Sequence, residues 1–301
     1  MTWNSRDVTV DALERLLKSE QGCEIRLLVR DNGSTDGTPD AIRERFPDVE
    51  LDAGSENLGF AGGMNRLIAR SDAPWFFPLN SDAWPEDQCL VTLVQAAEEH
   101  PRAAAIAPLL LQPDGTLEHS THPFPSPRVA LLVTAGNTAS VRRRGDEFFL
   151  EGMWMHDRPR TVDWAVGAAL LMRREALDEI GPFDERFFMY AEDLEWCWRA
   201  HRHGWSIQFE PAAVVRHIGN VSGATRYGQR RRAAYMANTY RFYAREHGWA
   251  AMNVYRALNV AGVLRHFAAA RAARDEAAAG YWRSTLGAYM GRGAPDDPRR
   301  A

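Results

Sequence analysis

Cysteine is scarce in this sequence: Cys23, Cys89 and Cys197 are the three cysteines among 301 residues. They are far apart and odd in number, which excludes a disulfide framework and the paired spacing of a zinc site. Long apolar runs are also missing. The longest, around residues 164–172, is far shorter than the ~20 residues of a bilayer span, and the first residues lack the apolar segment of a signal peptide. These absences predict a globular protein of the reducing cytoplasm.

Charge is distributed unevenly along the chain. The net charge is −4, but residues 226–301 hold fourteen arginines against five acids, a balance of +9, which leaves −13 for the first 225 residues. Such a basic region predicts contact with an anionic surface, either phospholipid or a phosphate-bearing substrate, and solvated arginine-rich helices are the alternative. Nucleic acid is not expected as a partner, because the acidic part would repel it.

Helical and strand patterns alternate through the first 225 residues. Short apolar runs at 25–29, 75–79 and 103–111 are separated by segments with helical periodicity. This order predicts an α/β fold with a mostly parallel sheet flanked by helices, whose ligands bind at the carboxyl ends of the strands. Further strands are expected at residues 162–172, 206–209 and 212–217.

Three regions are expected along the chain. Residues 1–225 form the α/β domain, residues 226–291 form a helical extension, and residues 292–301 form a disordered tail. Within the first region, residues 119–160 contain several prolines and three consecutive arginines, and we expect them to form inserted surface loops.

Two polar clusters suit the binding of a nucleotide. Asp31 opens a turn-rich segment after a predicted strand, where a carboxylate can accept hydrogen bonds from a ribose or a base; a simple Asx turn is the alternative. Three glycines between Asn57 and Asn65 lie at a predicted helix start. Free N–H groups at such a start attract phosphate or sugar oxygens, although close packing of the helix on the sheet explains the glycines equally well.

Three further positions suit catalysis and metal binding. Asp82 follows a buried strand, where a carboxylate fits a hard divalent cation that also binds substrate phosphates; a helix cap is the alternative. Glu192 and Asp193 begin a predicted helix, and an ionised carboxylate there can act as a general base, although acids are common at helix starts. His217 ends a strand and offers an imidazole ligand, but taken alone it is more simply structural.

Taken together, these segments form an ordered set of motifs that spans Thr2 to about Gly223. The set resembles the inverting glycosyltransferases of family 2, which have the GT-A fold, and within them the bacterial rhamnosyltransferase-type enzymes. The motifs are TWNS at 2–5, DNGSTDGT at 31–38, NLGFAGGMN at 57–65, NSD at 80–82, GPFDERFFMYAEDLEWCWRAHRHGW at 181–205 and HIGNVSG at 217–223.

The resemblance implies roles for individual residues. Asp193 would be the catalytic base with Glu192 as its support, and Asp82 and His217 would bind Mg²⁺ or Mn²⁺. The family's usual Asp-x-Asp metal motif starts here with an asparagine. The nucleotide would be bound by Thr2, Asn4, Asp31, Asn57, Gly59, Gly63, Asn65, Asn80 and Ser81.

The activity implied is metal-dependent transfer of a sugar, with rhamnose as the first choice, from a dTDP, UDP or GDP sugar. The acceptor would be a hydroxyl of a glycan or of a lipid-linked molecule. The product would belong to cell-surface polysaccharide or glycolipid synthesis. Two alternatives remain open. A sugar nucleotidyltransferase would need a basic cluster beside the first loop, where Arg30 stands alone. A catalytically impaired, GT-A-like nucleotide-binding or scaffold protein is the other alternative, because the family's opening apolar strand is almost absent before Thr2.

The helical extension admits two interpretations. Aromatic residues such as Trp249 and Tyr281 lie among its arginines, a combination found in interfacial helices that contact lipid at the inner face of the plasma membrane. A helical cap that packs against the catalytic domain is the alternative.

Overall fold

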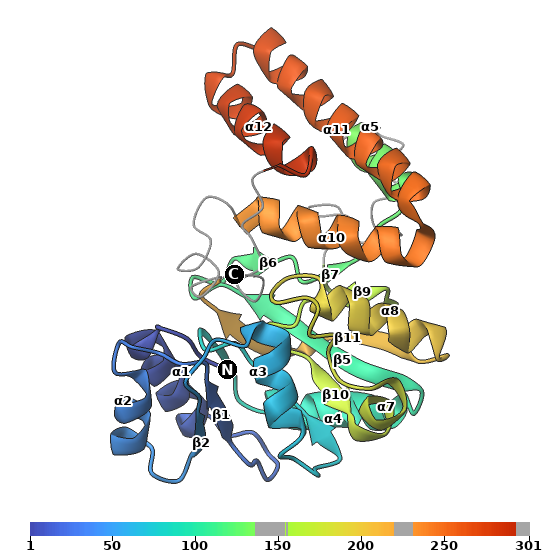
Figure 1. Cartoon of the computed structure of the whole chain (residues 1–301). Coiled ribbons are helices and arrows are strands. Elements are labelled where there is room, and N and C mark those ends of the chain that lie inside the picture. The colour runs from blue at the N-terminus through green and yellow to red at the C-terminus, as the bar shows by residue number, and fades with distance from the viewer. Residues whose placement is uncertain (136–153, 155, 220–230, 293–301) are drawn as a thin grey trace. The chain divides into compact units, whose positions relative to one another are not determined.

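In the computed structural model the chain divides into two compact units (Figure 1). The structure describes residues 1–135, 154, 156–219 and 231–292. The first unit comprises residues 1–122 and 156–225, and the second comprises residues 123–155 and 226–301. Residues 123–155, which are part of the segment expected to form inserted loops, therefore belong to the same unit as the C-terminal helices. The tail expected at 292–301 lies, apart from Arg292, outside the described residues.

The first unit alternates helices and strands, as the α/β prediction requires. Its helices are α1 (Arg6–Lys18), α2 (Thr38–Arg45), α3 (Gly59–Ile68), α4 (Cys89–Glu99), α7 (Arg174–Ile180) and α8 (Glu192–Arg202). Its strands are β1 (Leu28–Asp31), β2 (Glu50–Ala53), β3 (Trp75–Phe76), β4 (Ala83–Pro85), β5 (Ala103–Leu111), β6 (Leu117–Glu118), β7 (Thr121–His122), β8 (Arg160–Val162), β9 (Trp164–Ala165), β10 (Leu171–Arg173) and β11 (Ser206–His217).

The main sheet has the strand order β3-β10-β5-β11-β4, with β6 paired to β5 and β8 paired to β11. Its central strands, β5 and β11, are parallel, whereas β3, β4, β6, β8 and β10 pair with their neighbours in the antiparallel sense. β1 and β2 form a parallel pair of their own, and β7 and β9 form an antiparallel one. The mixed α/β architecture with a C-terminal helical region is thus confirmed.

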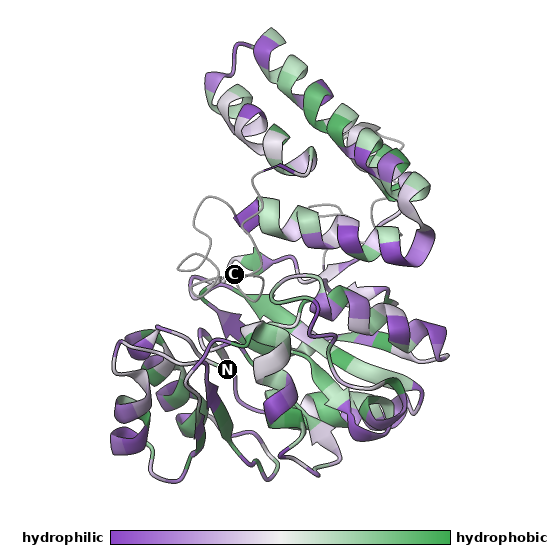
Figure 2. Ribbon diagram, in the orientation of Figure 1, coloured by the Kyte–Doolittle hydropathy of each residue, from purple (hydrophilic) through white to green (hydrophobic). Residues whose placement is uncertain are grey.

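Apolar burial explains why β5 lies at the centre of the main sheet. All of its residues from Ala103 to Pro108 are buried, so both of its faces are covered, which is typical of a central strand. Leu93 of α4 covers one face and is fully buried against Ile106 and Val215. Figure 2 shows this hydrophobic band across the strands. A smaller cluster packs α1 and α2 against β1 through Val10, Leu13, Val29, Ile42 and Phe46.

Three predictions about individual segments are wrong. Residues 162–172 do not form one strand: they contribute to β8, β9 and β10, which belong to two different sheets. Conversely, the two strands expected at 206–209 and 212–217 form one strand, β11, with an irregularity between Glu210 and Val214. The region expected to be loops contains helix α5 (Pro127–Ala135).

The second unit consists mainly of helices in the part that the structure describes. It contains α5, α10 (Arg231–His247), α11 (Trp249–Ala272) and α12 (Glu276–Tyr289). The Thr134 hydroxyl on α5 donates to the Leu258 carbonyl on α11 at 3.2 Å, and the Tyr240 hydroxyl on α10 donates to the Tyr289 carbonyl at 2.9 Å. None of the helices in the described ranges combines the length and apolar character needed to span a bilayer.

Candidate active site

The first polar cluster forms around Asp31 at the end of β1. Thr2 bridges to Asp31 as a short parallel partner, and the Asn32 N–H donates to the Thr2 carbonyl at 2.9 Å. Asn4 reaches the same loop, because its Oδ1 accepts a hydrogen bond from the Thr35 N–H at 2.8 Å. The structure therefore brings Thr2, Asn4 and Asp31 together.

One oxygen of the Asp31 carboxylate accepts hydrogen bonds from the described part of the protein, and the other does not. Its Oδ2 accepts hydrogen bonds from the N–H groups of Gly33 at 3.1 Å and Ser34 at 2.9 Å, which shapes the turn. Asp31 is fully buried, yet its Oδ1 has no hydrogen-bond partner among the residues that the structure describes. A buried acceptor without a donor is costly, so this oxygen is suited to a donor on a ligand.

The glycine-rich segment 57–65 forms the first turns of α3 and packs very closely. Gly59 has a φ of +76°, and a Cβ there would lie 2.2 Å from the Phe188 carbonyl oxygen. A Cβ on Gly63 would lie 2.8 Å from Cγ of Met1. Asn57 caps the turn by accepting from the Gly59 N–H at 2.9 Å. These contacts explain the glycines by packing, and their part in nucleotide binding stays a prediction.

The side chain of Asn65 joins α3 to the segment that precedes α8. Its Oδ1 accepts from the Phe183 N–H at 3.0 Å, and its Nδ2 donates to the Phe183 carbonyl at 2.9 Å. The same Nδ2 donates to Oε1 of Glu185 at 2.9 Å. Asn65 therefore positions the loop that leads to Glu192 and Asp193, and contact with a nucleotide stays a prediction for this residue.

Asp82 and His217 are neighbours across two paired strands. His217, the last residue of β11, pairs with Ala83 of β4, the residue after Asp82, and the Ile218 N–H donates to the Asp82 carbonyl at 2.9 Å. Oδ1 of Asp82 lies 3.3 Å from Nε2 of His217, and both side chains are almost fully buried. Asn80 Nδ2 lies 3.2 Å from the same Nε2.

The charges around His217 favour a cation at this place. Burial alone would lower the pKa of His217, but the hydrogen bonds and negative charges of Asp82 and Glu118 outweigh it and raise the pKa to about 9. Nε2 of His217 then carries a proton that faces the carboxylate of Asp82. A divalent cation can take the place of this proton, because a neutral imidazole nitrogen and a carboxylate oxygen are both good ligands.

The donor set fits a metal that is bound partly by the substrate. Among the described residues, no group of three or more His, Cys, Asp or Glu side chains is arranged to hold a metal ion. Asp82 and His217 offer two ligands, and hard divalent cations in phosphate-transfer sites take few protein ligands and complete their shell with phosphates and water. The pair therefore fits Mg²⁺ or Mn²⁺ bound together with a diphosphate.

Glu192 and Asp193 form the first turn of α8. Oδ2 of Asp193 accepts from the Gly167 N–H at 2.9 Å, and Oδ1 accepts from the Leu194 N–H at 2.8 Å. Burial raises the pKa of Asp193 above its ordinary value although these hydrogen bonds oppose the shift. A carboxylate with a raised pKa is a stronger base, and this property suits proton abstraction.

Glu192 is buried in the same helical turn as this carboxylate. Burial and the charge of Asp193 raise the pKa of Glu192 well above its ordinary value. Its Oε2 is buried and, within the described part of the chain, has no hydrogen-bond partner. Burial and the proximity of the two carboxyl groups therefore disfavour a negative charge on Glu192.

A backbone segment links the base to the metal pair. Gly167 donates to Asp193, and the next residue, Ala168, accepts at its carbonyl a hydrogen bond from the Asn80 N–H at 2.9 Å. The motifs around Asn80, Asp82, Asp193 and His217 are thus brought together although they are distant in the sequence.

Sequence reasoning missed three features of this site. Glu118 contacts His217, and Gly167 contacts Asp193, but neither belongs to a motif. Tyr190 and Ala191 both have positive φ, of 72° and 73°, and such strain in non-glycine residues often marks functional loops. A residue's backbone strain cannot be read from its type, and Glu118 is ninety-nine positions from its partner.

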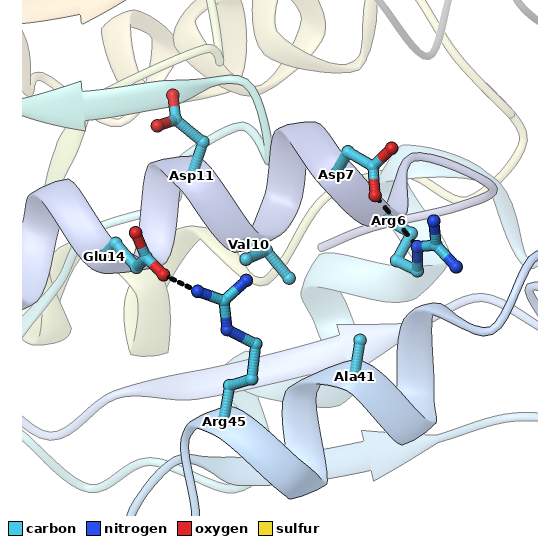
Figure 3. A pocket seen from close by; sticks show the side chains of 7 residues that line it. All are labelled: Arg6, Asp7, Val10, Asp11, Glu14, Ala41 and Arg45. Carbon is cyan, nitrogen blue, oxygen red and sulfur yellow. Dashed lines mark hydrogen bonds and ion pairs between the residues drawn. The ribbon is translucent and has the colours of Figure 1, made fainter.

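Two hollows of different character lie in the described part of the first unit. One of about 500 Å³ lies between α1 and α2 (Figure 3). Its arginines are paired with acids, Arg6 with Asp7 at 2.9 Å and Arg45 with Glu14. The other, of about 360 Å³, has a mainly apolar lining, which runs from Thr2 past β1 and β3 to Asn80 and Ser81.

Comparison with known proteins identifies the family. The profile described as "Glycosyl transferase family 2" matches residues 1–181, and that described as "Glycosyl transferase family group 2" matches residues 125–289. An N-acetylglucosaminyl-diphospho-decaprenol L-rhamnosyltransferase of Mycobacterium tuberculosis is 34% identical over 246 residues, which cover 75% of this chain and 76% of that protein.

Two solved structures share the fold at low sequence identity. A mannosyltransferase from Pyrobaculum calidifontis in complex with GDP-Man and Mn²⁺ has a TM-score of 0.57 at 18% identity, covering 96% of this chain and 82% of that one. GalNAc-T7 with UDP, GalNAc and Mn²⁺ has a TM-score of 0.52 at 12% identity, covering 70% and 40%. The family profile spans more than half of the chain, and with the 34% identical relative it shows that the protein is a glycosyltransferase of family 2 with the GT-A fold.

Proposed function

We propose that this glycosyltransferase moves L-rhamnose from dTDP-rhamnose to a hydroxyl of a lipid-linked sugar diphosphate, with inversion at the anomeric carbon and with Mg²⁺ or Mn²⁺. The observation that carries the proposal is the backbone link through Gly167 and Ala168, which joins the candidate base Asp193 to the Asn80–His217 contact. The donor and acceptor are taken from the M. tuberculosis relative, whose name gives a rhamnosyl group and an N-acetylglucosaminyl-diphospho-decaprenol.

Each residue has a defined task in the proposed reaction. Asp31 accepts a hydrogen bond from the nucleoside through its open oxygen, with Thr2 and Asn4 shaping the loop. Asp82 and His217 would hold the divalent cation, which when bound would neutralise charge on the leaving diphosphate. Asp193 accepts the proton of the acceptor hydroxyl while the acceptor oxygen bonds to the anomeric carbon and the bond from that carbon to the diphosphate oxygen breaks.

Inversion follows from a single displacement. Asp193 takes a proton rather than attacking the sugar, so no glycosyl-enzyme intermediate forms. The environment of Asp193 supports proton abstraction. Two backbone N–H groups orient its carboxylate, and burial raises its pKa, which makes it a stronger base. General-base assistance of this kind contributes about 10²–10⁴-fold to the rate.

The proposal is tested with the full chain and a panel of donors. dTDP-rhamnose, UDP-N-acetylglucosamine and GDP-mannose are each incubated with N-acetylglucosaminyl-diphospho-polyprenol and MnCl₂, and the products are separated and their anomeric configuration is determined by NMR. Transfer from dTDP-rhamnose alone, with inversion and with loss of activity in EDTA, is the expected result. Retention of configuration, or full activity in EDTA, contradicts the mechanism; preference for another donor contradicts the choice of rhamnose.

We also propose that the second unit contacts lipid at the inner face of the plasma membrane. Trp249 is 74% exposed at the start of α11, and Val254 and Leu264 are about half exposed on the same helix. Arginines accompany these apolar side chains, and Arg232 lies 4.8 Å from the ring centre of the half-exposed Tyr281. Flotation with anionic vesicles at low salt tests the proposal: Trp249→Ala should reduce binding, and a wild-type chain that stays unbound contradicts it.

A further inference from the structure

Glu118 lies next to the metal pair although it belongs to none of the motifs. Its Oε2 accepts a hydrogen bond from Nδ1 of His217 at 2.8 Å, while the other ring nitrogen, Nε2, lies 3.3 Å from Oδ1 of Asp82. An ionised carboxylate can only accept, so Nδ1 must carry the hydrogen. The imidazole is thus held between two carboxylates, and with 4% of its surface exposed it has little contact with water.

Strand pairing explains how Glu118 reaches His217. Glu118 of β6 pairs with Leu110 of β5, and Leu110 pairs with Val215 of β11. His217 follows Val215 by two positions, so its side chain lies on the same face of the strand. The pairing of β4 with β11 brings Asp82 from the opposite side.

The hairpin that carries Glu118 is itself well anchored. The Gln112 N–H donates to the Thr116 carbonyl at 2.8 Å, and the Gly115 N–H donates to the Gln112 carbonyl at 2.9 Å. Gly115 has a φ of +88°, as the tight turn requires. Arg216 Nη1 also donates to the Gln112 carbonyl at 3.2 Å. These bonds fix the hairpin against β11, and Glu118 thereby stays in register with the histidine.

We propose that Glu118 is a positioning residue that orients His217 as a metal ligand. A histidine ring can turn by half a rotation about its Cβ–Cγ bond, which exchanges nitrogen and C–H positions. An acceptor at Nδ1 selects one orientation and one tautomer, and the lone pair of Nε2 is then directed toward Asp82. This inference rests on the proposed function, since it assigns Glu118 to the metal site of that reaction.

A second carboxylate, which follows β4 and contacts the neighbouring residue of β11, provides a matched control. Glu86 accepts a hydrogen bond from Nε of Arg216 at 2.6 Å, one residue before His217. Glu118 is 28% exposed and Glu86 is 41% exposed. Glu86→Gln removes a carboxylate bonded to β11 without touching the imidazole, so a general weakening of the sheet edge would appear in both variants.

The test measures Mn²⁺ binding by isothermal titration of the full chain saturated with dTDP. Glu118→Ala should weaken Mn²⁺ binding by about 10–100-fold, the usual effect of removing a carboxylate behind a metal-binding histidine. Glu118→Gln has the same shape and keeps an acceptor oxygen, so it should fall between Glu118→Ala and the wild type. Glu86→Gln should match the wild type. Affinity for dTDP measured without metal should be unchanged in all of these variants.

Combination with His217→Ala decides whether Glu118 acts through the histidine. In the His217→Ala background, Glu118→Ala should cause no further loss of Mn²⁺ affinity. Wild-type affinity in Glu118→Ala and Glu118→Gln, or an equal loss in both backgrounds, overturns the inference. If the wild-type chain with dTDP fails to bind Mn²⁺ at all, both the metal-dependent function and this inference are wrong. If the wild-type chain binds Mn²⁺ and the Glu118 variants bind it equally well, only this inference is wrong.

Discussion

The backbone N–H of Gly167 donates to Oδ2 of Asp193 at 2.9 Å. A Cβ at position 167 would lie 3.3 Å from the ring of Phe60, which is a tight contact, and 3.5 Å from Cβ of Asp193, which is an ordinary one. The proposed base is therefore oriented by two backbone N–H groups, those of Gly167 and Leu194.

Replacing Asp193 with asparagine should abolish most of the transfer activity without unfolding the chain. Asparagine keeps an oxygen for the Gly167 N–H, while its NH₂ group takes the place of the oxygen that accepts from Leu194. It cannot accept a proton, so kcat should fall by about 10²–10⁴-fold. Affinities for dTDP and Mn²⁺, measured by isothermal titration, should remain those of the wild type. Asp178→Asn, at an exposed position on α7, is the control. Wild-type turnover in Asp193→Asn would remove Asp193 from its role.

The acid limb of the pH–rate profile should reflect the raised pKa of Asp193. Burial raises this pKa above its ordinary value of 3.8, and the base is active only when it is ionised. The rate should therefore rise with pH, with a midpoint above that of an ordinary aspartate. kcat/KM measured at saturating metal from about pH 4 upward tests this. A rate that is already at its plateau at the lowest pH would contradict the assignment.

Replacing Asp31 with asparagine should weaken nucleotide binding while preserving the loop. The asparagine oxygen can still accept from Gly33 and Ser34, but an NH₂ group then stands at the open Oδ1 position. A ligand donor would meet a donor there, and we expect a loss of about 5–150-fold in dTDP affinity, since a buried unsatisfied group costs about 1–3 kcal/mol. Asp40→Asn on the exposed side of α2 should bind like the wild type. Equal affinities would show that Asp31 does not contact the nucleotide.

Acid should destabilise the first unit through His122. Burial and the adjacent His119 and His156 lower the pKa of His122 from 6.5 to about 3. Because the unfolded chain binds this proton and the folded chain does not, the stability is complete above pH 6.5 and is lost as the pH falls toward about 3. The free energy of unfolding should fall by up to about 1.4 kcal/mol per pH unit in this window.

Urea unfolding at several pH values measures this slope. His122 stacks on Trp164 with ring centres 4.6 Å apart, and His122→Phe keeps an aromatic ring in place without a titrating nitrogen. The variant should show a shallower loss of stability between neutral and acid pH than the wild type. Identical slopes would show that His122 is protonated equally easily in both states.

Much of the fold and part of the site could be predicted from the sequence, for identifiable reasons. Asp31 and Asp82 follow short apolar runs, and the ends of strands collect at one edge of an α/β sheet. Glu192 and Asp193 precede a clear helical period that ends at Gly204. Local patterns of this kind are sufficient to predict a residue's position when that position depends only on the residue's own strand or helix.

The remaining features depend on pairing between distant segments. The apolar run at 162–172 does not reveal that β8 and β10 join the main sheet while β9 pairs with β7. Each of the three strands has apolar, buried side chains, so the residue types do not distinguish them. Glu118 reaches His217 only through the register of β6, β5 and β11, and register is not visible in residue types. The positive φ of Tyr190 and Ala191 likewise depends on the fold around them.

The irregularity in β11 has a consequence for how this protein can vary. Glu210 pairs with Pro108 and Val214 with Leu109, so residues 211–213 have no counterparts on β5. Side chains alternate between the two faces of a strand, and an odd change in length there would turn His217 away from Asp82 and Glu118. Catalytically active descendants of this sequence should accumulate substitutions at 211 and 212, which are not buried, but no single-residue insertion or deletion.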